Sequence, residues 1–172
     1  MRKIILCVAV SLDGMIEGPN GEYDWCFTDQ DYGMSGFMKR VDAIFYGRKS
    51  YEMMQKAEQG GSENPFGKVK SYVFSNTLDV AYPGTVLVRS IEVVKEIKSQ
   101  PGKDIWLWGG ASLTTSLLNA GLIDEMLLAV HPIVLGSGKA LFTEIDGRKH
   151  FALKSSEAYS SGLVMLSYEA KK

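Results

Sequence analysis

Two short segments of the sequence place glycine directly before a predicted helix: GRKS at residues 47–50 and GGAS at residues 109–112. The first turn of a helix presents free backbone N–H groups and the positive end of the helix dipole. A preceding glycine lets a ligand approach the backbone closely. Phosphate groups bind readily at such helix starts. Both segments therefore predict a phosphate site, although Gly109-Gly110 could also form only a tight turn.

The charges of the first segment support a bound anion. Arg48 and Lys49 lie at the helix end where cations are electrostatically unfavourable, and Ser50 adds a hydroxyl group. A basic pair at this position suits a polyanion, and the alternative is a pair of solvated surface charges. Ser75 and Asn76 follow another predicted strand and either add two uncharged donors or form a simple turn. Neither segment has the G-x-G-x-x-G spacing, so the Rossmann fingerprint does not apply.

Predicted strands and helices alternate along the chain. Apolar runs predict strands at residues 3–10, 42–46, 70–75, 85–88, 105–108 and 126–134. Capping residues and periodic apolar positions predict helices at residues 28–40, with Thr28 as N-cap, and at residues 48–57, 90–98 and 111–120. Loops are expected at residues 17–23 and 59–67, and a closing antiparallel pair at residues 151–156 and 164–169. No linker interrupts residues 1–172, which indicates a single α/β domain.

This alternation predicts a mainly parallel sheet with helices on both faces. In such sheets ligands bind beyond the carboxyl ends of the strands. SLDG at residues 11–14, GRKS and GGAS each follow a predicted strand, so we expect them to meet at one edge of the sheet. The loop LGSGK at residues 135–139 is either a second phosphate-binding nest or a plain surface loop.

Composition restricts the partners. The net charge is −1 and no basic cluster is present, which excludes phosphate-driven binding to nucleic acid. No apolar run approaches the roughly 20 residues that a membrane span requires. Cys7 and Cys26 do not make a disulfide framework, and we expect a cytoplasmic protein that acts on a small molecule. The two histidines form no metal-ligand spacing, so no metal site is expected, and His131 is expected to be a hydrogen-bonded core residue.

The same segments resemble the dihydrofolate reductase superfamily, in which SLDG, a loop tryptophan, GRKSYE and GG-x-x-L follow one another in this order. The segment GGASLTTSLLNAGLIDEMLLAVHPIVLGSGKALF is more similar still to the C-terminal reductase domain of the bifunctional riboflavin biosynthesis deaminase/reductase, the RibD C-terminal type. The resemblance implies one dihydrofolate reductase-like three-layer sandwich over residues 1–172. Its central, mainly parallel sheet would have about eight strands and an antiparallel C-terminal pair. The resemblance also implies an oxidoreductase that uses NADPH, usually as a homodimer.

Carried over residue by residue, the resemblance assigns contacts with the cofactor. The implied residues are Ala9, Ile16, Gly47, Arg48, Lys49, Ser50, Ser75, Asn76, Gly109, Gly110, Ala111, Ser112 and Leu113. The first two would flank the nicotinamide. Residues 47–50 and 109–113 would hold phosphates at the two helix starts, and residues 75–76 would lie near the 2′-phosphate of the adenine ribose. In folate reductases the matching Gly-Gly peptide bond is cis, and we expect the same at Gly109–Gly110.

Departures from both families leave the substrate open. Riboflavin-pathway reductases usually have a glutamate before the glycine pair, where this chain has Trp108, and GRKSYE is more folate-like. Folate reductases carry a catalytic carboxylate on the helix after the loop tryptophan. Trp25 matches that tryptophan, so Asp31 and Asp29 are the candidate catalytic residues, although both could be acids that complement the helix dipole. A catalytic carboxylate buried in the cleft would have a raised pKa.

The expected function is an NADPH-dependent reductase of the riboflavin-pathway type. Its substrate would be 5-amino-6-(5-phosphoribosylamino)uracil or a related small heterocyclic or carbonyl-type compound. One alternative is a dihydrofolate reductase, and the other is a non-catalytic dinucleotide-binding protein that kept only the cofactor cleft. For an enzyme, residues 17–25 are the candidate lid that excludes water.

Overall fold

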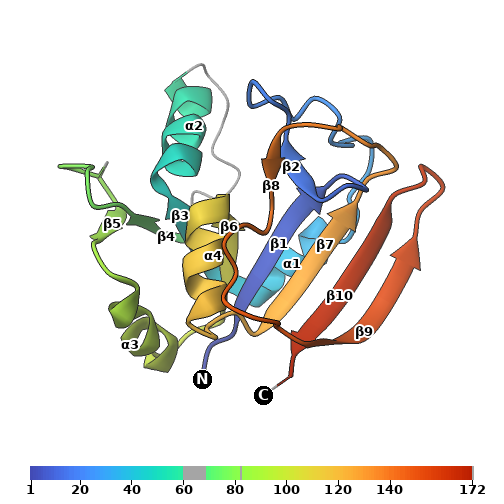
Figure 1. Cartoon of the computed structure of the whole chain (residues 1–172). Helices are drawn as coiled ribbons and strands as arrows, with labels where there is room; N and C mark the ends of the chain where they lie inside the picture. The colour runs from blue at the N-terminus through green and yellow to red at the C-terminus, as the bar shows by residue number, and fades with distance from the viewer. Residues whose placement is uncertain (60–68, 82, 172) are drawn as a thin grey trace.

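The computed structural model describes residues 1–59, 69–81 and 83–171, so that the loop predicted at residues 59–67 lies almost wholly outside the described residues. The main strands are β1 (Ile4–Val10), β3 (Val41–Gly47), β4 (Lys70–Phe74), β5 (Thr85–Val88), β6 (Asp104–Gly109), β7 (Glu125–Val130), β9 (Phe151–Ala158) and β10 (Val164–Ala170). They form one 8-stranded sheet in the order β5-β4-β3-β6-β1-β7-β10-β9 (Figure 1). All strands from β5 to β7 in this order are parallel, and β10 is antiparallel to both of its neighbours. The predicted parallel sheet with an antiparallel C-terminal pair is confirmed.

Helices cover both faces of the sheet and make three layers. The 3₁₀ turn η1 (Ile91–Val93), α3 (Val94–Ser99) and α4 (Ala111–Asn119) pack on one face. The helices α1 (Met34–Arg40) and α2 (Arg48–Gln59) pack on the other. Figure 1 shows α4 in front of the sheet and α1 behind it. Alternate residues of β1 point to different layers, with Ile4 and Leu6 in the first core cluster and Ile5 in the second.

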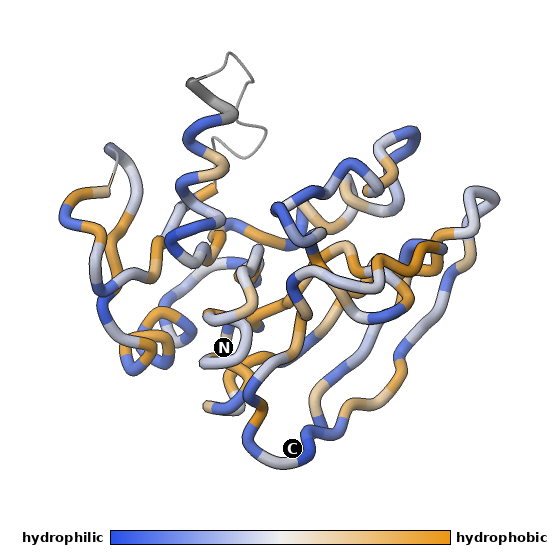
Figure 2. The backbone as a smooth tube through the Cα atoms, turned by 45° about the horizontal axis from the view of Figure 1, so that its top comes forward, coloured by the Kyte–Doolittle hydropathy of each residue, from blue (hydrophilic) through white to orange (hydrophobic). Residues whose placement is uncertain are grey.

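Burial on both faces explains why β1 reads as a continuous apolar run. Ile4, Ile5 and Leu6 are fully buried, and each contributes about 1.5–3 kcal/mol through removal of its side chain from water. In Figure 2 the hydrophobic colour follows the central strands, whereas the connecting segments at the rim are mostly hydrophilic. The central strands therefore form the rigid platform from whose ends the loops extend.

The helix predicted at residues 28–40 begins six residues later than expected, at Met34. Tyr32 and Gly33 both have positive φ angles, of 48° and 80°, which an α-helix cannot accommodate. Thr28 therefore caps no helix. Gly33 is the N-cap, and the Oδ1 of Asp31, two residues before it, accepts the backbone N–H of Ser35 in the first turn at 2.9 Å.

The strand predicted at residues 126–134 ends at Val130, and the next two residues are His131 and Pro132, of which the proline has no N–H for a strand ladder. The sequence pattern also missed a small antiparallel pair, β2 (Met15–Glu17) with β8 (Lys139–Ala140). Both strands are too short for a periodic apolar pattern to reveal them. The cap predicted for residues 90–98 is present, because Ser90 Oγ accepts the N–H of Glu92.

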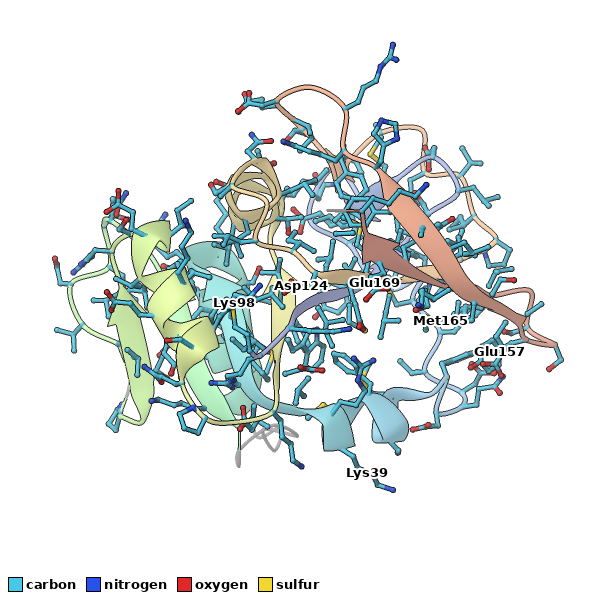
Figure 3. The ribbon with its side chains drawn as sticks, turned by 90° about the horizontal axis from the view of Figure 1, so that it is seen from below. Lys39, Lys98, Asp124, Glu157, Met165 and Glu169 are labelled. Carbon is cyan, nitrogen blue, oxygen red and sulfur yellow. The ribbon has the colours of Figure 1, made fainter. Side chains whose placement is uncertain are left out.

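Ion pairs hold the amino ends of the strands together. Lys98 Nζ donates to the Asp124 carboxylate, and the two residues are labelled side by side in Figure 3. Asp124 also accepts the backbone N–H of Ile4 at 2.8 Å, so the same carboxylate fixes the start of β1. This network lies at the edge of the sheet remote from the strand carboxyl ends. No helix within the described parts of the chain has the length and apolar character that a bilayer crossing requires.

Candidate functional site at the carboxyl edge of the sheet

The strand order creates a crevice between β3 and β6. From β3 the chain passes through α2 to β4 on one side, and from β6 it passes through α4 towards β7 on the other. A reversal of this kind is the position at which open α/β sheets bind ligands. GRKS follows β3 and GGAS spans the end of β6, so the two predicted phosphate segments lie on the two sides of this crevice.

The two helix starts touch each other. The backbone N–H of Gly110 donates to Ser50 Oγ at 3.1 Å. A Cβ atom on Gly110 would lie only 3.3 Å from the same oxygen, and one on Gly47 would lie 3.6 Å from the Gly109 carbonyl oxygen. Side chains at these glycines would fill the space between the helix starts. Neither α2 nor α4 has an acidic residue in its first turn, so no carboxylate there competes for the free N–H groups.

The Gly109–Gly110 peptide bond is cis. This confirms the geometry that the resemblance to folate reductases implied. Gly109 has a φ angle of 112°, which only glycine adopts readily.

A cleft of about 450 Å³ opens over the two helix starts. It is lined by Gly47, Arg48, Lys49, Ser50, Phe74, Ser75, Asn76, Thr77, Val88, Arg89, Ser90, Ile91, Gly110, Ala111, Ser112, Leu113, Ser116 and Lys139. The structure thus brings together most of the predicted cofactor residues. Gly109 is not in this lining, but its carbonyl oxygen lies 3.6 Å from the position of a Cβ on Gly47. Ala9, on β1, and Ile16, on β2, do not line the cleft, and their contact with a nicotinamide stays a prediction.

The cleft is positively charged. Its lining includes four cationic side chains, Arg48, Lys49, Arg89 and Lys139, and none of the described lining residues is Asp or Glu. Arg48 approaches Glu52 of its own helix at 3.7 Å, and Arg89 donates to the Ser75 carbonyl oxygen at 2.8 Å. Field lines from like charges concentrate in such a cleft and attract anions.

Sequence reasoning missed Arg89, and it assigned Lys139 only to the loop LGSGK, as part of a possible phosphate-binding nest and not of this cleft. Arg89 directly follows β5, and the rule that carboxyl strand ends meet at one edge would have placed it beside Ser75. Lys139 carries no such signal, because the pairing of β8 with β2 brings it to the cleft.

A buried hydroxyl group beneath the glycine pair has no partner. Thr114 on α4 is fully buried, and its Oγ1 forms no hydrogen bond among the described residues. It lies 3.9 Å from the position that a Cβ on Gly109 would occupy. Buried polar groups are normally hydrogen-bonded, but Thr114 is not among the residues that line the cleft, so this hydroxyl group identifies no ligand contact.

The loop after β1 is tied to the loop that precedes β8. Asp13 accepts the Ser11 hydroxyl at 2.6 Å and the backbone N–H groups of Leu135 and Gly136 at 3.1 and 2.8 Å. The Ser11 hydroxyl, followed by these N–H groups, lowers the pKa of Asp13 to about 2. Two of the N–H groups that a phosphate nest at residues 135–139 would need are therefore already bonded.

Neither of the two candidate catalytic carboxylates is buried. Asp29 and Asp31 are both exposed. The Ser35 hydroxyl and backbone N–H lower the pKa of Asp31, because hydrogen bonds stabilise its charged form. Asp29 accepts the Tyr32 hydroxyl at 2.7 Å. Asp31 is thus a helix-start acid in this structure, and a catalytic role for either residue stays a prediction.

His131 is the hydrogen-bonded core residue that its sequence context predicts. Its Nε2 accepts the Phe27 backbone N–H at 3.1 Å, which leaves Nδ1 to donate to the Ala129 carbonyl oxygen at 2.9 Å. The rings of Trp25 and Phe27 contact the imidazole at centroid distances of 5.2 and 5.0 Å. Burial lowers the pKa of His131.

Among the described residues, no group of three or more His, Cys, Asp or Glu side chains is placed so that it could hold a metal ion.

The amino-acid sequence matches one family model and is similar to a protein of Bacillus subtilis. The family model described as the RibD C-terminal domain matches residues 2–165. The uncharacterized protein YyaP of Bacillus subtilis is 43% identical over 177 aligned positions, which cover 97% of this chain and 94% of that protein.

Solved structures share the fold. A protein from Shewanella sp. PV-4, provisionally named for riboflavin biosynthesis, is 26% identical with a TM-score of 0.86, and the match covers 99% of both chains. Dihydrofolate reductase from Enterococcus faecalis, solved with NADP(H) and RAB-propyl, has a TM-score of 0.71 at 16% identity, with 99% of this chain and 97% of that chain covered. At the latter identity the likeness shows the fold alone.

Proposed function

The chain belongs to the RibD C-terminal domain family, and from this premise we propose that it is an NADPH-dependent reductase of the riboflavin-pathway type. The proposed substrate is 5-amino-6-(5-phosphoribosylamino)uracil or a related small heterocyclic or carbonyl-type compound. NADPH would supply the hydride, and the protein would supply binding, orientation and exclusion of water.

The observation that carries this proposal is the pair of joined helix starts in a cationic cleft. Ser50 Oγ accepts the N–H of Gly110, so its own O–H remains available to donate to a phosphate oxygen. The free N–H groups of α4 and the side chains of Arg48 and Lys49 face the same cleft. Together they provide the donors that a pyrophosphate needs.

The end of the cleft near β4 and β5 suits a further phosphate. Ser75 and Asn76 follow β4, and Arg89 follows β5 and bonds to Ser75. These residues would hold the 2′-phosphate that distinguishes NADPH from NADH. At the start of α4, the conformational freedom of Gly109 and Gly110 fits a polar cofactor group that approaches the backbone closely.

Calorimetric titration with NADPH and, separately, NADH tests the first half of the proposal. We expect micromolar binding of NADPH and a clear preference for it over NADH. The second half is tested by the loss of absorbance of the reduced nicotinamide when the aminouracil ribosyl phosphate is added. Absence of binding to both nucleotides would contradict the cofactor assignment and with it the reductase.

A dihydrofolate reductase is the second candidate, and the folate-like segment GRKSYE at residues 47–52 favours it. Turnover of dihydrofolate that methotrexate inhibits would replace the riboflavin-pathway proposal.

The exposure and lowered pKa of Asp31 favour a third candidate, a non-catalytic dinucleotide-binding protein without a proton donor. That reading predicts NADPH binding without hydride transfer to either substrate.

We also propose that the protein is a homodimer. An apolar hollow of about 290 Å³ on the sheet side near the C-terminus is lined by Leu118, Met126, Leu128, Phe142, Ile145, Lys149, Phe151 and Tyr168. Leu153 pairs in register with Tyr168, lies on the end strand β9 and is 55% exposed. Apolar surface beside a free strand edge supports contact with a second chain.

A further inference from the structure

Lys139 connects the cofactor cleft with the loop after β1. It lies on β8 opposite Glu17 of β2, and its Nζ approaches Glu17 Oε1 at 3.2 Å. A Cβ on Gly138 would come within 2.2 Å of the Glu17 carbonyl oxygen, so only glycine permits this approach of the two strands. The backbone itself therefore positions Lys139 beside Glu17.

The Lys139 amine also faces the start of α4. Its Nζ lies 4.0 Å from the position that a Cβ on Gly110 would occupy, and the residue lines the cleft. The free N–H groups at the start of α4 and the Lys139 amine are thus directed at one space. A phosphate in that space would accept hydrogen bonds from both.

Glu17 is a weak competitor for this amine. The two side chains are 34% and 36% exposed, and ion pairs of such exposure contribute little to stability because water screens them. Hydrogen bonds from a lysine to phosphate oxygens are charge-assisted and stronger. Exchange of the carboxylate for a phosphate is therefore favourable.

We propose that Lys139 is a ligand of the cofactor pyrophosphate, and that Glu17 holds its amine until the cofactor binds. This inference rests on the proposed function, since it requires a dinucleotide in the cleft. The assignment to the pyrophosphate follows from the position of the Lys139 amine beside Gly110, at the start of α4. The pyrophosphate is common to NADPH and NADH, so Lys139 acts equally on both.

Calorimetric titrations of four variants test the exchange. Lys139→Gln should weaken NADPH and NADH by the same factor, about tenfold, through loss of a charge-assisted hydrogen bond. Glu17→Gln should tighten both nucleotides by a few-fold, because it removes the competing carboxylate. In the double variant that gain should disappear, since the two residues act through one contact. Lys139→Arg should keep most of the affinity.

Lys154→Gln is the matched control, because Lys154 pairs with Glu169 at the same 3.2 Å on the edge of the sheet away from the cleft. The affinity of Lys154→Gln for NADPH and for NADH should equal that of the wild type. An unchanged affinity in Lys139→Gln, a loss for NADPH alone, or weaker binding in Glu17→Gln would overturn the inference while the proposed function stands. A wild-type protein that binds neither nucleotide would overturn both.

Discussion

Ser50 Oγ accepts the backbone N–H of Gly110 and so joins the start of α2 to the start of α4. The sequence pattern indicated a phosphate site at each of these two segments separately, because a glycine before a helix is a local signal. Their hydrogen bond depends on strands β3 and β6 being neighbours. The two residues are 60 positions apart in the chain, and no local pattern predicts such a contact.

The first residue-scale prediction concerns Arg48. Arg48→Ala should weaken NADPH binding by about 1.5 kcal/mol, roughly tenfold, which is the lower end expected for a charge-assisted hydrogen bond. The lower end applies because the side chain is 45% exposed and already approaches Glu52. Calorimetric titration measures the change. The control is Lys56→Ala, which removes a cation from the exposed last turn of the same helix and should bind NADPH like the wild type. An unchanged affinity in Arg48→Ala would show that Arg48 does not contact the phosphates.

The burial of Asp29 and Asp31 could not be predicted from their residue type and position in the chain. Asp29 and Asp31 stand at the spacing from Trp25 that suggested a catalytic carboxylate, yet both are exposed. The positive φ angles of Tyr32 and Gly33 delay the start of the helix, and Asp31 accepts the N–H of Ser35 in its first turn. Burial, which decides the pKa of a carboxylate, depends on tertiary packing and cannot be inferred from the spacing.

At the scale of elements, His131 attaches the segment before α1 to the end of β7. Its Nε2 accepts the Phe27 N–H only when the imidazole is neutral. Burial lowers its pKa in the folded state, so the unfolded chain takes up the proton first as the pH falls. The stabilisation is complete above the unfolded pKa of about 6.5 and is lost progressively as the pH falls through the lower folded value.

We therefore expect the free energy of unfolding to fall between about pH 7.5 and about pH 5.5, and part of that fall to come from His131. The measurement is urea unfolding followed by circular dichroism at both pH values. His131→Gln keeps an acceptor and a donor without titrating, so its loss over the same range should be smaller. An equal pH dependence in both proteins would exclude His131 as the source.

A second element-scale prediction concerns the amino edge of the sheet. Asp124→Ala should lower the free energy of unfolding by about 3–5 kcal/mol, because it leaves the buried Lys98 amine without its carboxylate. The Ile4 N–H loses its acceptor as well. Denaturant unfolding measures the change. The control is Glu169→Gln, which breaks only exposed ion pairs with Lys3 and Lys154 and should change the free energy of unfolding little. A similarly small change in Asp124→Ala would show that the buried ion pair does not stabilise the fold.

At the scale of the whole molecule, the proposed dimer places the apolar hollow and β9 against a second chain. Leu153→Lys adds a charge to this face and should shift the protein from dimer to monomer in sedimentation equilibrium. Val80→Lys is the matched control, because Val80 is 78% exposed and lies between β4 and β5 at the other end of the sheet. A wild-type protein that sediments as a monomer would refute the dimer proposal, and a Leu153→Lys variant that stays dimeric would place the contact elsewhere.

The fold class and the residue types at each strand end can be inferred from the sequence alone. Continuous apolar runs such as residues 4–10 indicate strands buried on both faces, and helices between them imply a parallel sheet whose carboxyl ends meet. A glycine before a helix start predicts either an anion site or a tight turn. These signals are local, because they depend on periodicity and on the conformational freedom of one or two residues. The cis bond at Gly109–Gly110 was expected from the resemblance to a known family.

Which residues share the cleft and which carboxylates are buried depends on the packing of distant segments. The order that puts β3 beside β6 joins Ser50 to Gly110, and the pairing of β2 with β8 brings Lys139 into the cleft. The exposure of Asp31 and the burial of His131 were settled in the same way. Contacts between distant segments and removal from water are properties of the packed chain, and a short run of sequence does not contain them.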